Sequence, residues 1–142
     1  NVKKIIKKYK IDIVQVPFNV FDQRLIHENF SKYKKLEIHC RSIFLQGLLL
    51  KESKDIPKKF NALKAKWKKW DNWVNVKKIN KMEACLNFVL KYKNIYDKIV
   101  VGVENKDQLK KIYNFKERSK ILDYSSFDNK KKQVIKKNFL RK

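Results

Sequence analysis

The chain of 142 residues has the length of one ordinary domain, which is enough to bury a hydrophobic core. Its apolar fraction of 43% argues against a wholly disordered chain, and no apolar run approaches the roughly 20 residues that span a bilayer, so we expect no membrane partner. The net charge of +23 is typical of proteins that bind nucleic acids. However, only four of the 37 basic residues are arginine, and the lysines are spread along the chain. This distribution favours a solvated lysine surface over a specific nucleic-acid site.

Hydrophobic periodicity divides the chain into short helices and strands that alternate. In chain order we expect a helix over Asn1–Tyr9, a strand over Ile11–Phe18, a helix capped by Asp22 with Leu25, Ile26, Phe30 and Tyr33 inward, a strand over Leu36–Ser42, helices over Pro57–Trp73 and Val76–Tyr92, a strand over Lys98–Gly102, a helix over Asp107–Tyr113 and a weaker helix around Lys130–Leu140. Strands that alternate with helices predict an α/β fold with a parallel sheet.

Three parallel strands alone would leave two long hydrophobic edges, and such edges pair or aggregate. The sequence therefore predicts that the sheet is one part of a larger folded structure.

Cys40 and Cys85 lie far apart in the sequence, without CxxC spacing or a nearby pair of histidines. We therefore predict two free thiols, no metal site and a reducing compartment, the cytosol. The first ten residues, NVKKIIKKYK, contain no apolar stretch of signal-peptide type, so no secretory signal is expected there.

Three blocks of sequence carry a resemblance to a known family. They are DIVQVPFNVFDQRLI (12–26), IHCRSIFLQGLLL (38–50) and IVVGVENKDQL (99–109), and their order and spacing resemble the last three strands of the aldo/keto reductases. The resemblance covers nearly the whole chain and implies the C-terminal part of a (β/α)8 TIM barrel, strands 6–8 with their helices, as one partial domain over residues 1–142. It also implies a missing N-terminal half of the barrel as a partner, NADP or NAD as cofactor, and a small aldehyde or ketone as substrate.

The resemblance implies a cofactor role for nine residues. Gln15 matches the glutamine that hydrogen-bonds the nicotinamide carboxamide, and Arg41 stands where relatives place an aromatic side chain under the nicotinamide ring. The loop along the pyrophosphate is matched by Ser42, Phe44, Gln46 and Gly47, and the end of the last strand and the adenine side are matched by Gly102, Glu104 and Gln108.

Other interpretations of these positions remain open. Gln15 would also be explained as an amide satisfied inside the barrel, and Arg41 as a partner of a carboxylate from the missing part. Gly47 would also be explained by a turn alone. Glu104 is a departure from NADPH-preferring relatives, because a carboxylate repels the 2′-phosphate, whereas Lys106 would attract it. NADPH and NADH therefore both remain candidates.

The catalytic Tyr, Lys, Asp and His of the family belong to the first half of the barrel, and nothing in this chain matches them. His27 is expected on the surface and His39 inside a strand, so we assign no catalytic residue and expect no reductase activity from the chain alone. Two alternatives are a non-catalytic nucleotide-binding subunit and a basic nucleic-acid-binding module.

Overall fold

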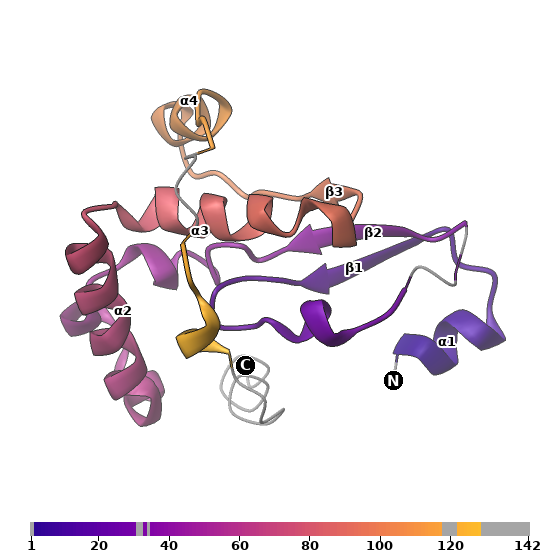
Figure 1. The fold of residues 1–142 in the computed structure, drawn as a ribbon, viewed down its shortest axis with the longest axis horizontal. Helices are drawn as coiled ribbons and strands as arrows, with labels where there is room; N and C mark the ends of the chain where they lie inside the picture. The colour runs from indigo at the N-terminus through magenta and orange to yellow at the C-terminus, as the bar shows by residue number, and fades with distance from the viewer. Residues whose placement is uncertain (1, 31–32, 34, 118–121, 129–142) are drawn as a thin grey trace.

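The computed structural model describes residues 2–30, 33, 35–117 and 122–128 (Figure 1). Over these residues the fold is mixed α/β, with one small three-stranded parallel sheet and four α-helices. The helix expected around Lys130–Leu140 lies outside the described residues. Among the helices of the described ranges, none is long and apolar enough to cross a membrane.

The sheet contains β1 (Ile13–Pro17), β2 (Glu37–Arg41) and β3 (Lys98–Ile99), in the spatial order β1-β2-β3. Both pairings are parallel, with Gln15 opposite His39 and Cys40 opposite Ile99, which confirms the parallel arrangement predicted from the sequence. Pro17 is the last residue of β1, where its missing N–H does least harm to the strand ladder. The third strand is much shorter than the five residues expected.

The two faces of the sheet differ in burial. Val14, Ile38 and Cys40 are buried in the core, as the alternation of side chains along a strand requires. On the opposite face Ile13 is 50% exposed, and Val100, just after β3, is 42% exposed. One face of the sheet is therefore packed, and the other carries apolar side chains open to solvent.

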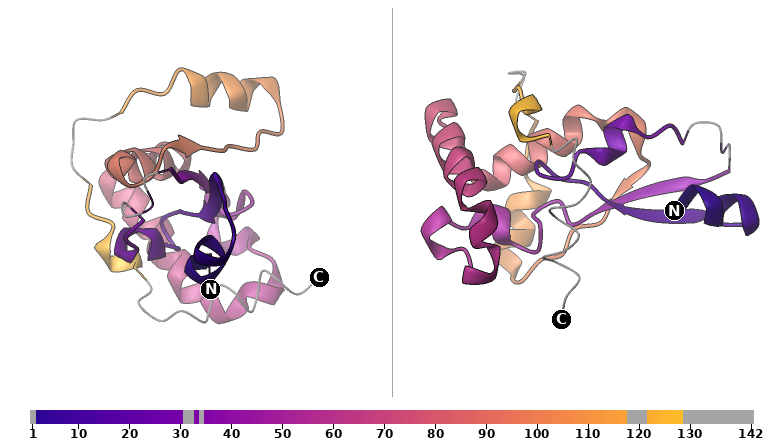
Figure 2. Two further views of the ribbon diagram at one scale, coloured as in Figure 1. Left: turned by 90° about the vertical axis from the view of Figure 1, so that its right-hand side faces the viewer. Right: turned by 90° about the horizontal axis from the view of Figure 1, so that it is seen from below.

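The helices are α1 (Val2–Lys8), α2 (Lys64–Lys77), α3 (Lys81–Lys91) and α4 (Lys106–Tyr113). They surround the sheet unevenly, with α2 and α3 at one end and α1 at the other (Figures 1 and 2). Phe18, just after β1, packs on Phe88 of α3 with ring centroids 4.9 Å apart.

The boundary between α2 and α3 was predicted wrongly. Instead of ending at Trp73, α2 continues to Lys77, and Lys78 then adopts the left-handed conformation with φ 51° and ends the helix. The following helix begins at Lys81 rather than Val76, because the Asn80 side chain accepts a hydrogen bond from the Glu83 N–H at 2.8 Å and caps it. The start of the expected Pro57–Trp73 helix is a 3₁₀ helix over Lys58–Leu63.

The prediction of an α-helix after Asp22 is also wrong, because only a 3₁₀ helix over Arg24–His27 forms there. Asp22 caps no helix, since both of its carboxylate oxygens accept hydrogen bonds from the Arg24 guanidinium, at 2.7 and 2.5 Å. Leu25 and Phe30 are nevertheless buried, as the apolar pattern predicted. The periodicity identified the buried side chains but not the backbone conformation.

An aromatic cluster joins α2 to the rest of the core. Phe21 packs on Trp67 with centroids 4.7 Å apart, and Trp70 stacks on Trp73 at 5.5 Å. The Trp70 indole donates a hydrogen bond to the Leu49 carbonyl at 3.0 Å. Trp70 therefore joins α2 to the segment after β2, and Trp67 packs the same helix on the segment after β1.

Lys66 of α2 gives the fold a measurable pH dependence. Its Nζ donates to the Phe127 carbonyl at 2.9 Å and lies 4.3 Å from the Phe21 ring centroid, and burial lowers its pKa from 10.5 to about 8. Between these values this amine binds more protons in the unfolded chain than in the folded chain, so its contribution to the free energy of unfolding should rise with pH from about 8 to 10.5, by about 1–2 kcal/mol with solvent screening. Burial raises the pKa of the Cys40 and Cys85 thiols above their ordinary value of 9.0, so their ionisation in the unfolded chain lowers the free energy of unfolding above about pH 9 and opposes this rise.

Urea unfolding of the parental chain and of Lys66→Met at several pH values would measure the contribution of this amine as the difference between the two stabilities. This difference should change by about 1–2 kcal/mol between pH 8 and 10.5, whereas the difference between the parental chain and Lys68→Met, a lysine that is exposed on the same helix, should stay constant. A difference for Lys66→Met that does not change with pH would contradict a buried amine at residue 66.

Candidate functional site

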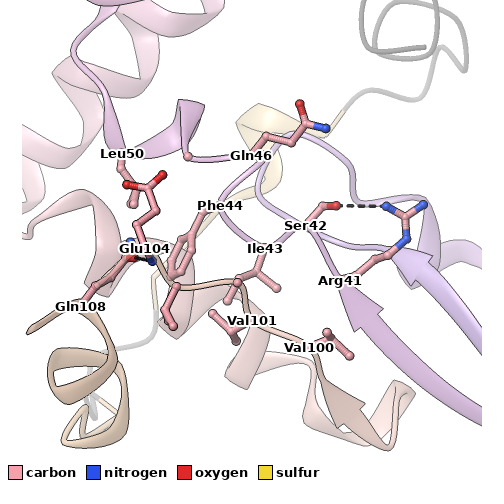
Figure 3. A pocket seen from close by; sticks show the side chains of 13 residues that line it. Arg41, Ser42, Ile43, Phe44, Gln46, Leu50, Val100, Val101, Glu104 and Gln108 are labelled. Atoms are coloured by element: carbon pink, nitrogen blue, oxygen red, sulfur yellow. Dashed lines mark hydrogen bonds between the residues drawn. The ribbon is translucent and has the colours of Figure 1, made fainter. Parts of the chain in front are cut away.

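A pocket with a cavity volume of about 420 Å³ lies at the C-terminal ends of β2 and β3 (Figure 3). Two segments far apart in the sequence form most of its wall, the loop 41–47 after β2 and the segment 100–108 after β3. Eight of the nine residues predicted from the sequence line this pocket: Arg41, Ser42, Phe44, Gln46, Gly47, Gly102, Glu104 and Gln108.

The parallel sheet brings the two segments together. Because β2 and β3 run in the same direction, their carboxyl ends meet at the same edge. The pairing continues just past β3, where the Val100 N–H donates to the Cys40 carbonyl at 2.7 Å. The polar residues that follow each strand are therefore neighbours in space.

Gln15, the ninth predicted residue, does not line the pocket. It is exposed in the middle of β1, opposite His39, and its position in the register puts it on the same open face of the sheet as Arg41. The structure therefore places Gln15 on the sheet surface that leads away from the pocket.

The loop after β2 has an unusual backbone. Ser42, Leu45 and Gln46 have positive φ values of 58°, 51° and 55°, and Gly47 follows with 77°. Such values favour glycine and cost free energy in other residues. A Cβ on Gly47 would meet nothing within 4 Å, so the glycine is explained here by its φ and not by a lack of space.

The same loop leaves backbone donors unused. The Leu45 N–H donates to the Ser42 carbonyl at 2.9 Å, and the Leu49 N–H donates to the Phe44 carbonyl at 3.1 Å. Within the described residues, five other N–H groups of this loop donate to no protein acceptor: those of Ser42, Ile43, Phe44, Gln46 and Gly47. Free N–H groups gathered in one loop offer hydrogen bonds to an anion.

Asn19 holds this loop in place and was missed by the sequence analysis. Its side chain is fully buried, and its Nδ2 donates to the Ser42 carbonyl at 3.1 Å. Its Oδ1 accepts from the N–H groups of Phe21 and Asp22, at 2.9 and 3.0 Å. Asn19 thus joins the segment after β1 to the segment after β2, and the only signal in the sequence was an asparagine directly after a strand.

On the other wall, Asn105 and Gln108 cap the start of α4. The Gln108 N–H donates to Asn105 Oδ1 at 2.8 Å, and the Gln108 side-chain oxygen accepts from the Glu104 N–H at 2.8 Å. One first-turn donor and the Gln108 oxygen are therefore already used, which leaves the Gln108 Nε2 to donate to a ligand. The Glu104 side chain is exposed at the pocket.

Charged side chains line the open face of the sheet beside the pocket. Glu37 contacts His39 at 2.9 Å and Lys98 at 3.2 Å, and the hydrogen bond from His39, followed by that from Lys98, lowers the pKa of Glu37. Arg41 Nη1 donates to Ser42 Oγ at 3.2 Å and has no carboxylate partner among the described residues (Figure 3).

His27 lies apart from the pocket, where its side chain pairs with Asp128 at 2.9 Å. Gly102 has no positive φ, and a Cβ there would meet nothing within 4 Å, so the described residues give no steric reason for a glycine at this position.

Comparisons of the chain with protein-family models, with curated protein sequences and with solved structures find no match.

Proposed function

We propose that the chain is the C-terminal part of a (β/α)8 barrel of the aldo/keto reductase type and that the pocket after β2 and β3 binds NADP or NAD. The observation that supports this most directly is the meeting of eight predicted residues in one cavity. They come from two loops that follow neighbouring parallel strands, which is where barrel enzymes of this kind hold the phosphates of a ligand.

The open face of the sheet supports the barrel part of the proposal. In a closed barrel this face turns inward, so Ile13 and Val100 would be covered by strands of the first half. The edges of β1 and β3 would then pair instead of remaining exposed. The proposed partner is therefore the N-terminal half of the barrel, and Arg41 is available to a carboxylate that this half supplies.

The donor groups of the pocket fit a dinucleotide. The free N–H groups of the 42–47 loop, with the Ser42 hydroxyl, suit a pyrophosphate, which accepts several hydrogen bonds and carries negative charge. Gln15 and Arg41 add further polar side chains on the open face of the sheet, between this loop and the proposed position of the nicotinamide. When bound, the reduced nicotinamide would supply a hydride to an aldehyde or ketone carbon.

None of the described residues is assigned an acid or base role. The contribution of this chain is thus binding and orientation, and proton transfer to the substrate oxygen would fall to the first half of the barrel. With Cys40 and Cys85 both free and buried, we propose the cytosol as the compartment of the protein.

The coenzyme preference can be tested with a charge reversal at the pocket. We expect the chain to bind NADH at least as tightly as NADPH, because the Glu104 carboxylate repels a 2′-phosphate. Glu104→Lys should raise the affinity for NADPH relative to NADH about tenfold, which corresponds to roughly 1.4 kcal/mol. Coenzyme fluorescence titration of the 142-residue chain would measure both constants, and carbonyl turnover should be absent.

Glu117→Lys is the matched control, since it makes the same charge change outside the pocket. It should leave the ratio of the two affinities unchanged. If neither coenzyme binds, the dinucleotide site is wrong, and if both variants shift the ratio equally, Glu104 does not face the ribose.

A further inference from the structure

The two walls of the pocket at the strand ends are attached to the rest of the molecule very differently. The loop 41–47 is fixed by the buried Asn19 side chain, which donates to the Ser42 carbonyl at 3.1 Å, and Phe44 and Leu45 of this loop are buried in the core. The residues of the opposite wall, 100–108, are all exposed or only partly buried. One wall is therefore fixed and the other is held weakly.

The helix that continues the second wall, α4, contributes no buried residue to the core, whereas seven residues of α3 are buried. Leu109 and Tyr113 of α4 are exposed, and only the partly buried Ile112 of this helix packs against the core. In Figures 1 and 2, α4 lies at the periphery of the molecule, beyond α3 and β3. A helix with so few buried apolar contacts should change its position at a low cost in free energy.

The segment that joins β3 to α4 has the features of a hinge. The Val100 N–H is still bonded to the sheet, at 2.7 Å from the Cys40 carbonyl, but the N–H groups of Val101, Gly102 and Val103 donate to no acceptor among the described residues. Gly102 is exposed, has no positive φ and would have space for a Cβ, so neither strain nor close packing explains the glycine. A need for backbone freedom does explain it, because glycine adopts conformations that other residues do not.

Beyond α4 the chain is attached to the core again at residues 122–128. Leu122, Tyr124 and Phe127 are buried there. The Tyr124 carbonyl accepts a hydrogen bond from Gln23 Nε2 at 2.9 Å, and the Tyr124 hydroxyl donates to the Ala84 carbonyl at 2.9 Å. The position of α4 is therefore limited on both sides, so that the helix can turn but not leave the molecule.

We propose that residues 101–117, which contain α4, form a hinged wall that turns about Gly102 and closes on a ligand in the pocket. Closing brings Gln108 toward the fixed loop, so that its Nε2 donates to the ligand (Figure 3). A ligand that contacts both walls binds the closed position more tightly and therefore increases its population. The ligand is the coenzyme of the proposed function, so the closing step rests on that proposal, whereas the hinge itself does not.

Distances between spin labels on the 142-residue chain, measured by double electron–electron resonance, would test the hinged wall. One pair of labels is attached at Lys111→Cys on α4 and Lys77→Cys on α2, and the control pair at Ile13→Cys on β1 and Lys77→Cys. These side chains are exposed, whereas Cys40 and Cys85 are buried, so the introduced cysteines take the label. Without ligand, the distance distribution of the α4 pair should be at least about twice as wide as that of the control pair, and saturating NADH should narrow it to about the control width.

Gly102→Ala tests the pivot. Because a Cβ at this position meets nothing within 4 Å, the variant should fold, which thermal unfolding would verify. Alanine has fewer backbone conformations available than glycine, so the ligand-free distribution of the α4 pair should narrow by about half. Asn114→Ala, at the other end of α4, is the control and should leave the width unchanged.

Equal widths of the two label pairs without ligand would show that α4 is held rigidly, and an unchanged width in a folded Gly102→Ala chain would remove the pivot; either result overturns the proposal. A wide distribution that NADH does not narrow, although coenzyme fluorescence shows that NADH binds, overturns the closing step. If NADH does not bind, the coenzyme site is wrong and the closing step falls with it, while the ligand-free widths still decide whether the wall is hinged.

Discussion

Replacing Trp70 with alanine is expected to lower the free energy of unfolding by about 3–5 kcal/mol. Trp70 is fully buried, and its ring contacts Trp73 at 5.5 Å and Phe127 at 5.4 Å between centroids. The substitution would leave a large cavity between α2 and the loop after β2. Because a domain is typically stable by about 5–15 kcal/mol, a large part of the total would be lost.

Trp70→Phe separates the packing of this side chain from its hydrogen bond. Phenylalanine fills most of the volume but leaves the Leu49 carbonyl without the donor that it has at 3.0 Å, so we expect a loss of about 1–3 kcal/mol. Urea unfolding followed by far-UV circular dichroism would measure both variants. An alanine variant that loses less than phenylalanine would contradict this account of the cluster.

The parallel sheet was predictable because the residues of each strand have a composition typical of strands. The runs IDIVQV and KIVV are rich in β-branched residues, and the segments between them have helical periodicity, so their alternation predicted parallel strands. The third strand was overestimated, because only Lys98 and Ile99 pair with β2 as a strand. Its extent depends on the partner strand, which a local pattern does not describe.

The helix errors have a different physical origin. The apolar pattern continues through Lys78, but the backbone there turns left-handed and Asn80 caps a new helix. After Asp22, the ion pair with Arg24 replaces the expected cap. In both places the position where a helix begins or ends depends on which hydrogen-bond partner a side chain takes. The sequence is compatible with several such partners.

The candidate site was predictable to the extent that it lies at strand ends. Parallel neighbours bring their C-terminal loops together, so the positions of Arg41 and Gly102 follow from topology. Gln15 is in the middle of β1 and therefore lies on a face of the sheet instead. The cap that occupies the Gln108 oxygen, and the bond from Asn19 to the loop, depend on backbone conformations that only the structure shows.

Asn19 provides the second large expected effect, because one side chain bonds three backbone groups. Asn19→Ala would leave the Phe21 N–H and the Ser42 carbonyl without this partner, whereas the Asp22 N–H would keep its bond to the backbone carbonyl of residue 19, at 2.9 Å. At about 1 kcal/mol or more for each of the two groups that lose their partner, the free energy of unfolding should fall by about 2–3 kcal/mol. Urea unfolding would measure the loss.

Asn19→Asp tests the link to the pocket. Aspartate keeps oxygens that accept from Phe21 and Asp22, but it has no N–H for the Ser42 carbonyl and places a carboxylate beside it. Hydrogen exchange should therefore accelerate at the amides of Leu45 and Leu49, which close the loop, by more than at amides of α3. If the loop conformation positions the proposed coenzyme site, affinity for NADH should fall as well, although Asn19 lines no part of that pocket. Uniform acceleration across the loop and α3 would instead mean that Asn19 supports the fold as a whole and has no particular role in shaping the pocket.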